Sequence, residues 1–370
     1  MEITRRHTRP VVVGGLLIGA GEPVAVQSMC NTDTRDVEAT ADQICRLAAA
    51  GCELVRVAVP DMEAARAIAD IKARIAMPLV ADIHFDHRLA IAAAEAGADG
   101  LRLNPGNIGS RQRVEKVIRV AAERDLAVRV GVNAGSLEKE LVAEHGGPTA
   151  AAMVVSALRH VEAIRAMGFD NLKVSLKASD IFRTVEAHRL FAKKSDTPLH
   201  VGVTEAGSRY AGVVKSSIGI GMVLAEGLGD TIRVSLTGDP VVEVRVAWHI
   251  LSALRLRQRG PEIVSCPTCG RCEIDLPAVV DAVEEGLDGV TASMQIAIMG
   301  CVVNGPGEAR EADVGVAGGR GQAILFKKGE VVARIPESRL AEVLIEEARA
   351  LAREREEKDP QREIDRNRTI

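Results

Sequence analysis

Aromatic residues are scarce in this sequence, and their scarcity limits how its core can be built. Only 2% of the 370 residues are Phe, Trp or Tyr, although 47% are hydrophobic. A large core can therefore form, but it must be packed from aliphatic side chains and alanine. The length is too great for one ordinary small domain and fits a barrel-sized unit followed by a smaller one.

Long apolar segments and a strong excess of one charge are also missing. Residues 1–6 lead into no apolar run, so we expect no secretion signal, and no stretch has the length and purity of a membrane-spanning helix. Seven cysteines, an odd number, without such a signal favour a metal and a reducing compartment, which we expect to be the cytoplasm. The net charge of −4, with both signs well mixed, argues against a general nucleic-acid-binding protein.

What the sequence does contain is a group of cysteines in its last third. Four of the seven lie within residues 265–308, namely Cys266, Cys269, Cys272 and Cys301. A C-x-x-C spacing brings two thiolates within reach of one metal centre, and a cysteine on a distant turn can complete the site. By spacing alone, these four suit a 4Fe–4S cluster or a structural zinc better than unrelated buried thiols. The Gly-Pro-Gly at 305–307 favours a cluster, because a tight turn exposes backbone N–H groups that can bond to sulfur.

The first part of the chain alternates short Val/Ile/Leu-rich runs with Ala/Glu/Arg-rich helical patterns. Helices are expected to begin after the turn or capping residues Asp36, Pro60, Ser110 and Asp180. The rhythm of eight such units in about 250 residues predicts a TIM (β/α)8 barrel. An open doubly wound sheet is the alternative, but no G-x-G-x-x-G follows an early strand. The expected strands are 24–29, 54–59, 79–85, 100–104, 126–133, 171–179, 200–205 and 231–237.

A smaller α+β unit should follow the barrel. The last barrel helix is expected over 240–257, and the break at Gly260-Pro261 places the boundary between residues 1–260 and 261–355. The mixed charges of 356–370 predict a solvated tail that is prone to disorder. Within the second unit we expect helices at 276–287 and 337–355, and strands at 295–299, 313–316, 323–327 and 330–334.

Polar side chains stand at the ends of the expected barrel strands, where a TIM barrel carries its active site. Five of them are cations on separate strands, and an arginine inside an apolar run is costly unless it meets an anion. Ion pairs with Asp82 and Glu205 could explain one or two, but not five. A phosphate or diphosphate suits guanidinium forks and is the expected ligand. The strand-end residues are Asn31, Arg56, Asp82, His84, Arg102, Asn104, Arg129, Asn133, Lys177, Glu205, Arg233 and Ser235.

Three of these residues could move or position a proton. Asp82 and His84 are two residues apart on one expected strand, which places both on the same face. A core histidine is the alternative reading of His84. Glu205 is a further candidate acid or base, and the alternative is that it pairs with a barrel arginine. The scattered Cys30, Cys45 and Cys52 are interpreted as buried or incidental thiols.

Motifs along most of the chain resemble a known family, the bacterial 4-hydroxy-3-methylbut-2-enyl diphosphate synthases of the methylerythritol phosphate route to isoprenoids. Their order matches as well, and the two cysteine-containing motifs are the most specific. Cys30 stands where the family would lead us to expect threonine. The motifs are VQSM at 26–29, DIHF at 82–85, LNPGN at 103–107, RVGVN at 129–133, KVSLKAS at 173–179, TEAG at 204–207, SCPTCGR at 265–271 and GCVVNGPGE at 300–308.

The resemblance implies a TIM barrel followed by an iron–sulfur domain. It also implies an oxidoreductase that opens 2-C-methyl-D-erythritol 2,4-cyclodiphosphate with two electrons and loss of water, giving 4-hydroxy-3-methylbut-2-enyl diphosphate. Flavodoxin or ferredoxin would supply the electrons. In such enzymes three cysteines and a glutamate hold a 4Fe–4S cluster, and these positions correspond here to Cys266, Cys269, Cys301 and Glu308. This ligand set makes Cys272 a bystander, unlike the reading from spacing alone.

The resemblance also assigns roles in the barrel. Asp82, His84 and Glu205 would position or protonate the departing oxygen, with Asn133 helping to orient it. Glu308 would be the more readily displaced cluster ligand, because a carboxylate oxygen is harder than a thiolate. The cyclic diphosphate would be held by Arg56, Arg102, Asn104, Arg129, Lys177, Arg233 and Ser235.

We further expect a two-fold homodimer with antiparallel chains, in which each active site is shared. The eighth barrel helix should end at the closed face of the barrel, and the linker at 258–264 spans at most about 23–25 Å. A barrel is roughly 25 Å tall, so a chain could hardly place its cluster over its own barrel mouth. Two other classes remain as alternatives: a binding barrel with a zinc ribbon, and a radical enzyme using S-adenosylmethionine. The C-x-x-x-C-x-x-C typical of the latter is absent.

Overall fold

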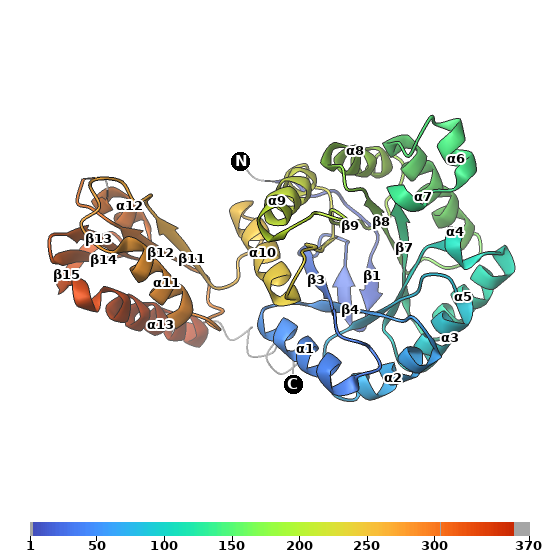
Figure 1. Cartoon of the computed structure of the whole chain (residues 1–370), viewed down its shortest axis with the longest axis horizontal. Coiled ribbons are helices and arrows are strands. Elements are labelled where there is room, and N and C mark those ends of the chain that lie inside the picture. The colour runs from blue at the N-terminus through green and yellow to red at the C-terminus, as the bar shows by residue number, and fades with distance from the viewer. Residues whose placement is uncertain (1–2, 304, 359–370) are drawn as a thin grey trace. The chain divides into compact units, whose positions relative to one another are not determined.

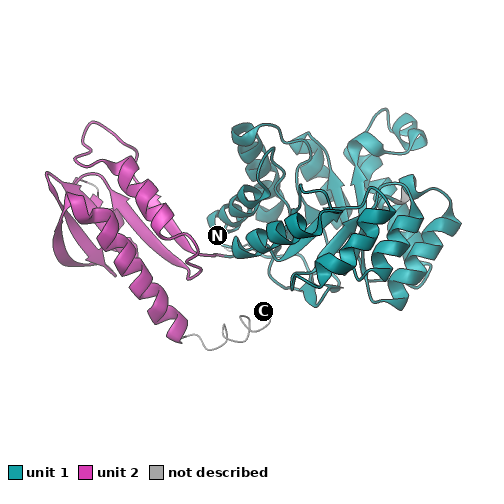
Figure 2. Cartoon of the chain, turned by 60° about the horizontal axis from the view of Figure 1, so that its bottom comes forward, with its two compact units in different colours: residues 1–257 teal, residues 258–370 magenta. Residues whose placement is uncertain are grey.

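A computed structural model of the chain describes residues 3–303 and 305–358. The chain forms two compact units, Met1–Arg257 and Gln258–Ile370, which are coloured separately in Figure 2. Residues 356–358 of the expected tail end a helix, and the rest of the tail lies outside the described residues. Within the described part of the chain, no helix is both long and apolar enough to cross a membrane.

The first unit is a barrel of eight parallel strands, as predicted from the strand–helix rhythm (Figure 1). The strands pair in the order β8-β7-β6-β5-β4-β3-β10-β9, and a bridge between Val174 and Leu199 joins the two ends of this row. The expected strands at 200–205 and 231–237 shrink to two residues each. The strands are β3 Ala25–Met29, β4 Leu54–Ala58, β5 Leu79–Asp82, β6 Gly100–Leu103, β7 Ala127–Asn133, β8 Leu172–Lys177, β9 His200–Val201 and β10 Thr231–Ile232.

Helices surround the barrel, and most begin at an acidic cap. The Asp36 and Asp180 side chains accept backbone N–H bonds at the predicted starts. The second start is shifted from Pro60 to Asp61, because the Asp61 carboxylate accepts from Ala64. The last barrel helix ends at Ala253 and not at residue 257. The helices are α1 Val37–Ala49, α2 Met62–Lys72, α3 His87–Glu95, α4 Pro105–Ile108, α5 Arg111–Glu123, α6 Lys139–Glu144, α7 Ala150–Arg165, α8 Ile181–Ala192, α9 Arg209–Ala225 and α10 Pro240–Ala253.

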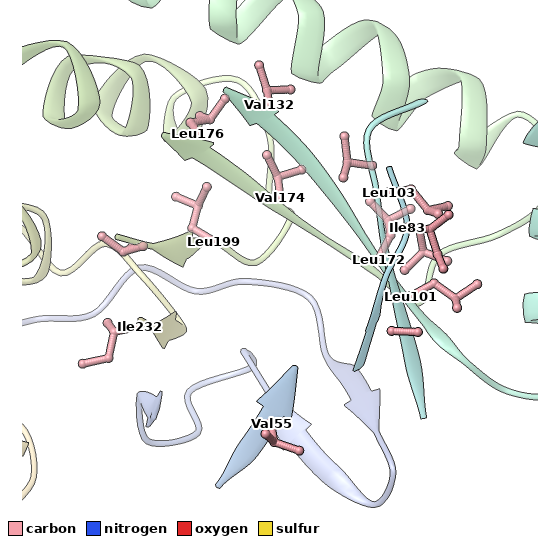
Figure 3. Packing of buried hydrophobic residues seen from close by; sticks show 14 of the residues in the cluster. Val55, Ile83, Leu101, Leu103, Val132, Leu172, Val174, Leu176, Leu199 and Ile232 are labelled. Carbon is pink, nitrogen blue, oxygen red and sulfur yellow. The ribbon is translucent and has the colours of Figure 1, made fainter. Parts of the chain in front are cut away.

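Aliphatic side chains fill the space between the strands and these helices, as Figure 3 shows. Along β8, Leu172, Val174 and Leu176 belong to this layer. Side chains alternate across a strand, so Lys173, Ser175 and Lys177 point to the other side of β8, into the barrel. The alternation that builds the core therefore also places cations in the interior.

A hairpin that the sequence analysis did not anticipate covers one end of the barrel. Strands β1 Val11–Val13 and β2 Leu16–Ile18 pair antiparallel. Their side chains pack against Leu54, Val80 and Ala127, which lie at the beginnings of β4, β5 and β7. This end is opposite to the strand ends that carry the cations, so the hairpin closes the barrel below the candidate site.

The second unit is a five-stranded mixed sheet with helices. Strands β11, β12 and β13 run parallel, and β14 and β15 continue antiparallel. Strand β11 was not predicted. The Gly-Pro-Gly at 305–307, expected to be a tight turn, instead opens helix α12, where proline is tolerated in the first turn. The elements are β11 Pro261–Ser265, α11 Leu276–Gly286, β12 Met294–Met299, α12 Gly305–Glu311, β13 Val314–Gly319, β14 Gln322–Lys327, β15 Glu330–Pro336 and α13 Leu340–Lys358.

Candidate active site

Cations from five parts of the barrel gather in its interior, towards the carboxyl ends of the strands. Arg56, Arg102 and Arg129 lie on β4, β6 and β7, and all three are buried. Arg102 and Arg129 are direct partners in the ladder between β6 and β7. Lys177 ends β8 and is also buried, and Arg233 directly follows β10. The parallel register thus gathers residues far apart in the sequence into one charged layer.

Two buried carboxylates face these five cations. Asp82 Oδ1 lies 3.1 Å from Arg102 Nη1, and Asp82 Oδ2 lies 3.6 Å from Arg56 Nε. Burial alone would raise the pKa of Asp82, but Arg56, the bond to His84 and Arg102 together hold it well below its usual range. Arg233 Nη2 lies 3.3 Å from both oxygens of Glu243. The Asp82 carboxylate is therefore ionised, and the five basic side chains outnumber the two carboxylates that face them.

Several of the guanidinium groups have donors that no protein atom satisfies. Among the described residues, Nε and Nη1 of Arg129 and Nε of Arg102 and Arg233 are buried without a hydrogen-bond partner. Arg56 donates to Met29 Sδ, a weak acceptor, at 2.8 and 3.1 Å. Burial, opposed by Asp82 but reinforced by the Arg233 charge, lowers the pKa of Arg56 to about 10. Unsatisfied buried donors are costly, which makes this layer a candidate site for an anion.

Two glycines make room for the charged layer. A Cβ atom on Gly131 would lie 2.7 Å from Arg102 Nε. A Cβ atom on Gly202 would lie 2.5 Å from the Arg233 carbonyl oxygen and 3.0 Å from Lys177 Nζ. Any side chain at these positions would displace a cation or the backbone that carries it, so the interior depends on glycine here.

The candidate acids differ in their surroundings. His84 Nε2 lies 3.6 Å from Asp82 Oδ2, which is the expected pairing, but β5 ends at Asp82 and His84 stands exposed in the following connection. Glu205 is exposed, with a left-handed φ of 52°. The alternative reading, in which Glu205 pairs with a barrel arginine, finds no support among the described residues, because Arg56 and Arg102 pair with Asp82 and Arg233 pairs with Glu243. The ion pair that this reading sought is made by Glu243.

The remaining polar residues border the same strand ends. Asn104 caps the short α4 and donates from Nδ2 to Ser136 Oγ at 3.2 Å. Asn133 ends β7 as the ladder partner of Lys177, and Ser235 follows β10 half-buried. Asn31 follows β3, where its Nδ2 donates to the Gly238 carbonyl oxygen at 3.2 Å. The structure therefore brings the sequence-predicted residues of the barrel to one end of it.

Glu243 is the site residue that sequence reasoning missed. It lies in α10 on the face that also buries Val244, Ala247 and Leu251. A carboxylate within such an apolar stripe is expensive unless a cation meets it. That pattern was the available signal, but it gave no indication of which arginine would be the partner.

The cysteines of the second unit lie at one edge of its sheet. Strands β11 and β12 are parallel, with Ser265 opposite Ile298, so the segments that follow them, which carry Cys266 and Cys301, emerge side by side. The Gly300 N–H donates to Cys266 Sγ at 3.2 Å. A backbone N–H of Arg271 lowers the pKa of the exposed Cys269 thiol. Glu308 lies in the first turn of α12, which packs beside β12 and β13.

These groups have the chemistry of a metal site but are not arranged as one. Within the described residues, no three His, Cys, Asp or Glu side chains stand at metal-binding distances from one another. Soft thiolates with a backbone N–H directed at sulfur suit iron–sulfur binding. Cys272 differs from the others, because its thiol donates to the Ile274 carbonyl oxygen at 3.3 Å and packs against Gly300.

The three cysteines of the barrel lie outside this group. Cys30 and Cys52 are buried, and burial raises the pKa of each thiol to about 12, so both are protonated. Cys45 is exposed on α1. None of the three is part of the charged layer at the strand ends.

Comparison with known proteins covers both units. Residues 8–248 match the family described as the GcpE TIM-barrel domain, and residues 262–350 match the GcpE protein C-terminal domain. The 4-hydroxy-3-methylbut-2-en-1-yl diphosphate synthase (flavodoxin) of Geobacter sulfurreducens is 58% identical over 95% of this chain and 99% of its own length. The protein of the same name from Bacillus subtilis is 52% identical over 95% of this chain and 94% of its own length.

Binding of inorganic pyrophosphate at the barrel mouth should take up protons. Burial, reinforced by Arg129 and Arg56, holds the pKa of Lys177 well below its ordinary value. A bound anion raises that pKa again, so affinity falls as the pH rises through the lowered value. Calorimetry at a series of pH values, each in two buffers of different ionisation enthalpy, measures the uptake.

Lys177→Ala should take up fewer protons than the parent protein on binding pyrophosphate. Burial lowers the pKa of Lys173 to about 7, so Lys173 can account for the proton uptake that remains in this variant. Lys116→Ala, on the exposed face of α5, is the matched control and should behave like the parent. Equal uptake by the parent and Lys177→Ala would show that Lys177 does not meet the anion.

Proposed function

The chain belongs to the GcpE family, and from this we infer that it is a 4-hydroxy-3-methylbut-2-enyl diphosphate synthase, an iron–sulfur oxidoreductase. The reaction opens 2-C-methyl-D-erythritol 2,4-cyclodiphosphate with two electrons and releases water. One observation carries the assignment beyond sequence identity. The barrel buries more cations than carboxylates at its strand ends, with guanidinium donors left unsatisfied, and a diphosphate supplies the missing acceptors.

The cations are proposed to hold the cyclic diphosphate. Guanidinium groups bind phosphate oxygens through paired N–H donors. Arg129 has two buried donors, Nε and Nη1, that have no partner among the described residues and could bond to phosphate oxygens. Lys177 adds a compact charge that neutralises a further phosphate oxygen. The proposed binding residues are Arg56, Arg102, Asn104, Arg129, Asn133, Lys177, Arg233 and Ser235.

Loss of water requires a proton at the departing oxygen. Asp82 was one of the expected donors, but the neighbouring cations outweigh the effect of burial and lower the pKa of its carboxyl group. Asp82 is therefore suited to hold His84, at 3.6 Å, and not to give up a proton itself. We propose that His84 or the exposed Glu205 delivers the proton, with Asn133 orienting the oxygen.

The second unit is proposed to hold a 4Fe–4S cluster through Cys266, Cys269, Cys301 and Glu308. When bound, this cluster supplies the two electrons, which the names of the relatives indicate come from flavodoxin. Two observations support this assignment of the cluster. The segments that carry Cys266 and Cys301 emerge side by side, and the Gly300 N–H donates to Cys266 Sγ. The carboxylate of Glu308 is the ligand that is more easily displaced.

We propose that a second copy of the chain presents its cluster to each barrel. Residues 254–260 connect α10 to β11 and span at most about 23–25 Å when fully extended. This length is no greater than the height of a barrel, roughly 25 Å, so a chain could hardly place its cluster over its own barrel mouth. Apolar exposure supports such docking. Phe85, which follows β5, is 69% exposed, and Phe182 and Tyr210, in the first turns of α8 and α9, are 75% and 87% exposed. Val302 and Val303 are exposed beside Cys301.

The cluster assignment predicts which cysteines are needed. Replacing Cys266, Cys269 or Cys301 by serine should remove most of the bound iron, because each supplies a thiolate. Cys272→Ser should retain the iron, because that thiol bonds to Ile274. Iron and sulfide analysis of protein purified without oxygen provides the measurement. Loss of the cluster in Cys272→Ser, together with an unchanged ligation spectrum in Glu308→Ala, would establish four cysteine ligands instead.

Each buried cation of the barrel should contribute separately to substrate binding. Arg102→Ala or Lys177→Ala should weaken binding of the cyclodiphosphate by roughly 1.5–3 kcal/mol, the scale of one charged hydrogen bond. Cluster content should stay at the parental level. Arg119→Ala, an exposed arginine on α5, is the control and should bind normally. Parental affinity in both barrel variants would exclude these residues from the site.

A shared active site predicts complementation between inactive chains. At a substrate concentration near the parental KM, Lys177→Ala binds little substrate and Cys301→Ser lacks the cluster, so neither homodimer should show appreciable turnover. In a mixed dimer, one intact barrel faces one intact cluster, and activity should return. The experiment mixes separately tagged chains and confirms mixed dimers before the assay. If mixed dimers form but remain inactive, each chain uses its own cluster.

A further inference from the structure

Glu243 is a buried carboxylate to which the proposed reaction gives no role. Its side chain is only 4% exposed, in the first turn of α10. Oε1 accepts from the Leu236 N–H at 2.8 Å, and Oε2 accepts from the Ser28 hydroxyl at 3.2 Å. Both oxygens also lie 3.3 Å from Arg233 Nη2. One carboxylate thus ties together α10, strand β3 and the segment that follows β10.

The segment that Glu243 holds has little other regular structure. Strand β10 has two residues, and after the Arg233 N–H bonds to the Val201 carbonyl oxygen at 2.9 Å the chain runs irregularly to the Asp239 cap of α10. Glu243 fixes this segment twice, by the side chain of Arg233 and by the backbone of Leu236. Ser235, a proposed substrate residue, lies between these two points. Without such an anchor a long arginine side chain would sample many rotamers.

The charge of Glu243 also reaches beyond its hydrogen bonds. Burial lowers the pKa of Arg56, and the charges of Arg233 and Arg102 add to this effect. Asp82 and, to a smaller extent, Glu243 oppose it. Removing Glu243 would leave Asp82 as the one buried carboxylate that faces the five cations in the described barrel. Charge alone would then attract an anion more strongly, whereas a displaced Arg233 would bind it less well.

We propose that Glu243 is a positioning residue of the diphosphate site, which holds the Arg233 guanidinium in place before the substrate arrives. It acts through Arg233 and does not touch the substrate. This inference rests on the proposed function, because it takes Arg233 as a ligand of the cyclodiphosphate. Positioning and simple charge attraction predict opposite changes in affinity, so the two can be separated by experiment.

A double-mutant cycle tests the proposal in protein purified with its cluster. Glu243→Gln preserves the size of the side chain and an oxygen for the Leu236 N–H, but it removes the charge that pairs with Arg233. The Kd for the cyclodiphosphate should rise about tenfold, as should KM, with little change in kcat. In an Arg233→Ala background, the same substitution should change Kd less than twofold. Asp239→Asn, at the cap of the same helix, removes a charge without contacting Arg233 and should have no effect.

Two results would overturn the proposal. Tighter or unchanged binding in Glu243→Gln would mean that charge outweighs positioning, and an equal loss in both backgrounds would mean that Glu243 only supports the fold. If Glu243→Gln does not fold, Glu243→Asp carries the same cycle, because it retains the charge but withdraws it from Arg233. Failure of the parent to bind the cyclodiphosphate would count against the proposed function, whereas the cycle with inorganic pyrophosphate would still test Glu243.

Discussion

Positive charge buried without matching negative charge is the constraint on which the barrel depends. Five cations face Asp82 and Glu243, and the guanidinium of Arg129 has two donors without a partner among the described residues. Unpaired buried charges cost several kcal/mol each, which the aliphatic layer around the barrel and the hairpin beneath it must outweigh. We propose that a bound diphosphate removes this cost. The destabilising arrangement in the free protein is therefore also the source of its affinity.

Much of the barrel could be predicted because its signals are local. Parallel strands buried between two layers are apolar runs, and an Arg or Lys at the end of such a run stands out. Parallel pairing then requires that these ends meet, which brings Arg102 beside Arg129 without any knowledge of the turns. The partner of Arg233 could not be found in this way. Glu243 lies on a helix, and whether it or Glu205 faces that arginine is decided by the path of an irregular segment.

The second unit was less predictable for a similar reason. Strand β11 is half-exposed, and its sequence lacks a clear alternation of apolar and polar residues. The Gly-Pro-Gly at 305–307 suits a turn as well as the start of a helix. Cysteine spacing indicated a metal and placed Cys272 among four cysteine ligands. Family resemblance favoured Glu308. The structure adds a physical reason against Cys272, whose thiol is bonded to Ile274 and packed against Gly300.

The central claim is that the free barrel is destabilised by charges that a diphosphate neutralises, and thermal unfolding of the whole chain tests it most directly. At a cyclodiphosphate concentration 100 times its Kd, the free energy of unfolding should rise by about 2.7 kcal/mol, which raises the melting temperature by several degrees. Inorganic pyrophosphate should act in the same direction. A melting temperature that neither compound changes, in protein with an intact barrel, would contradict the account.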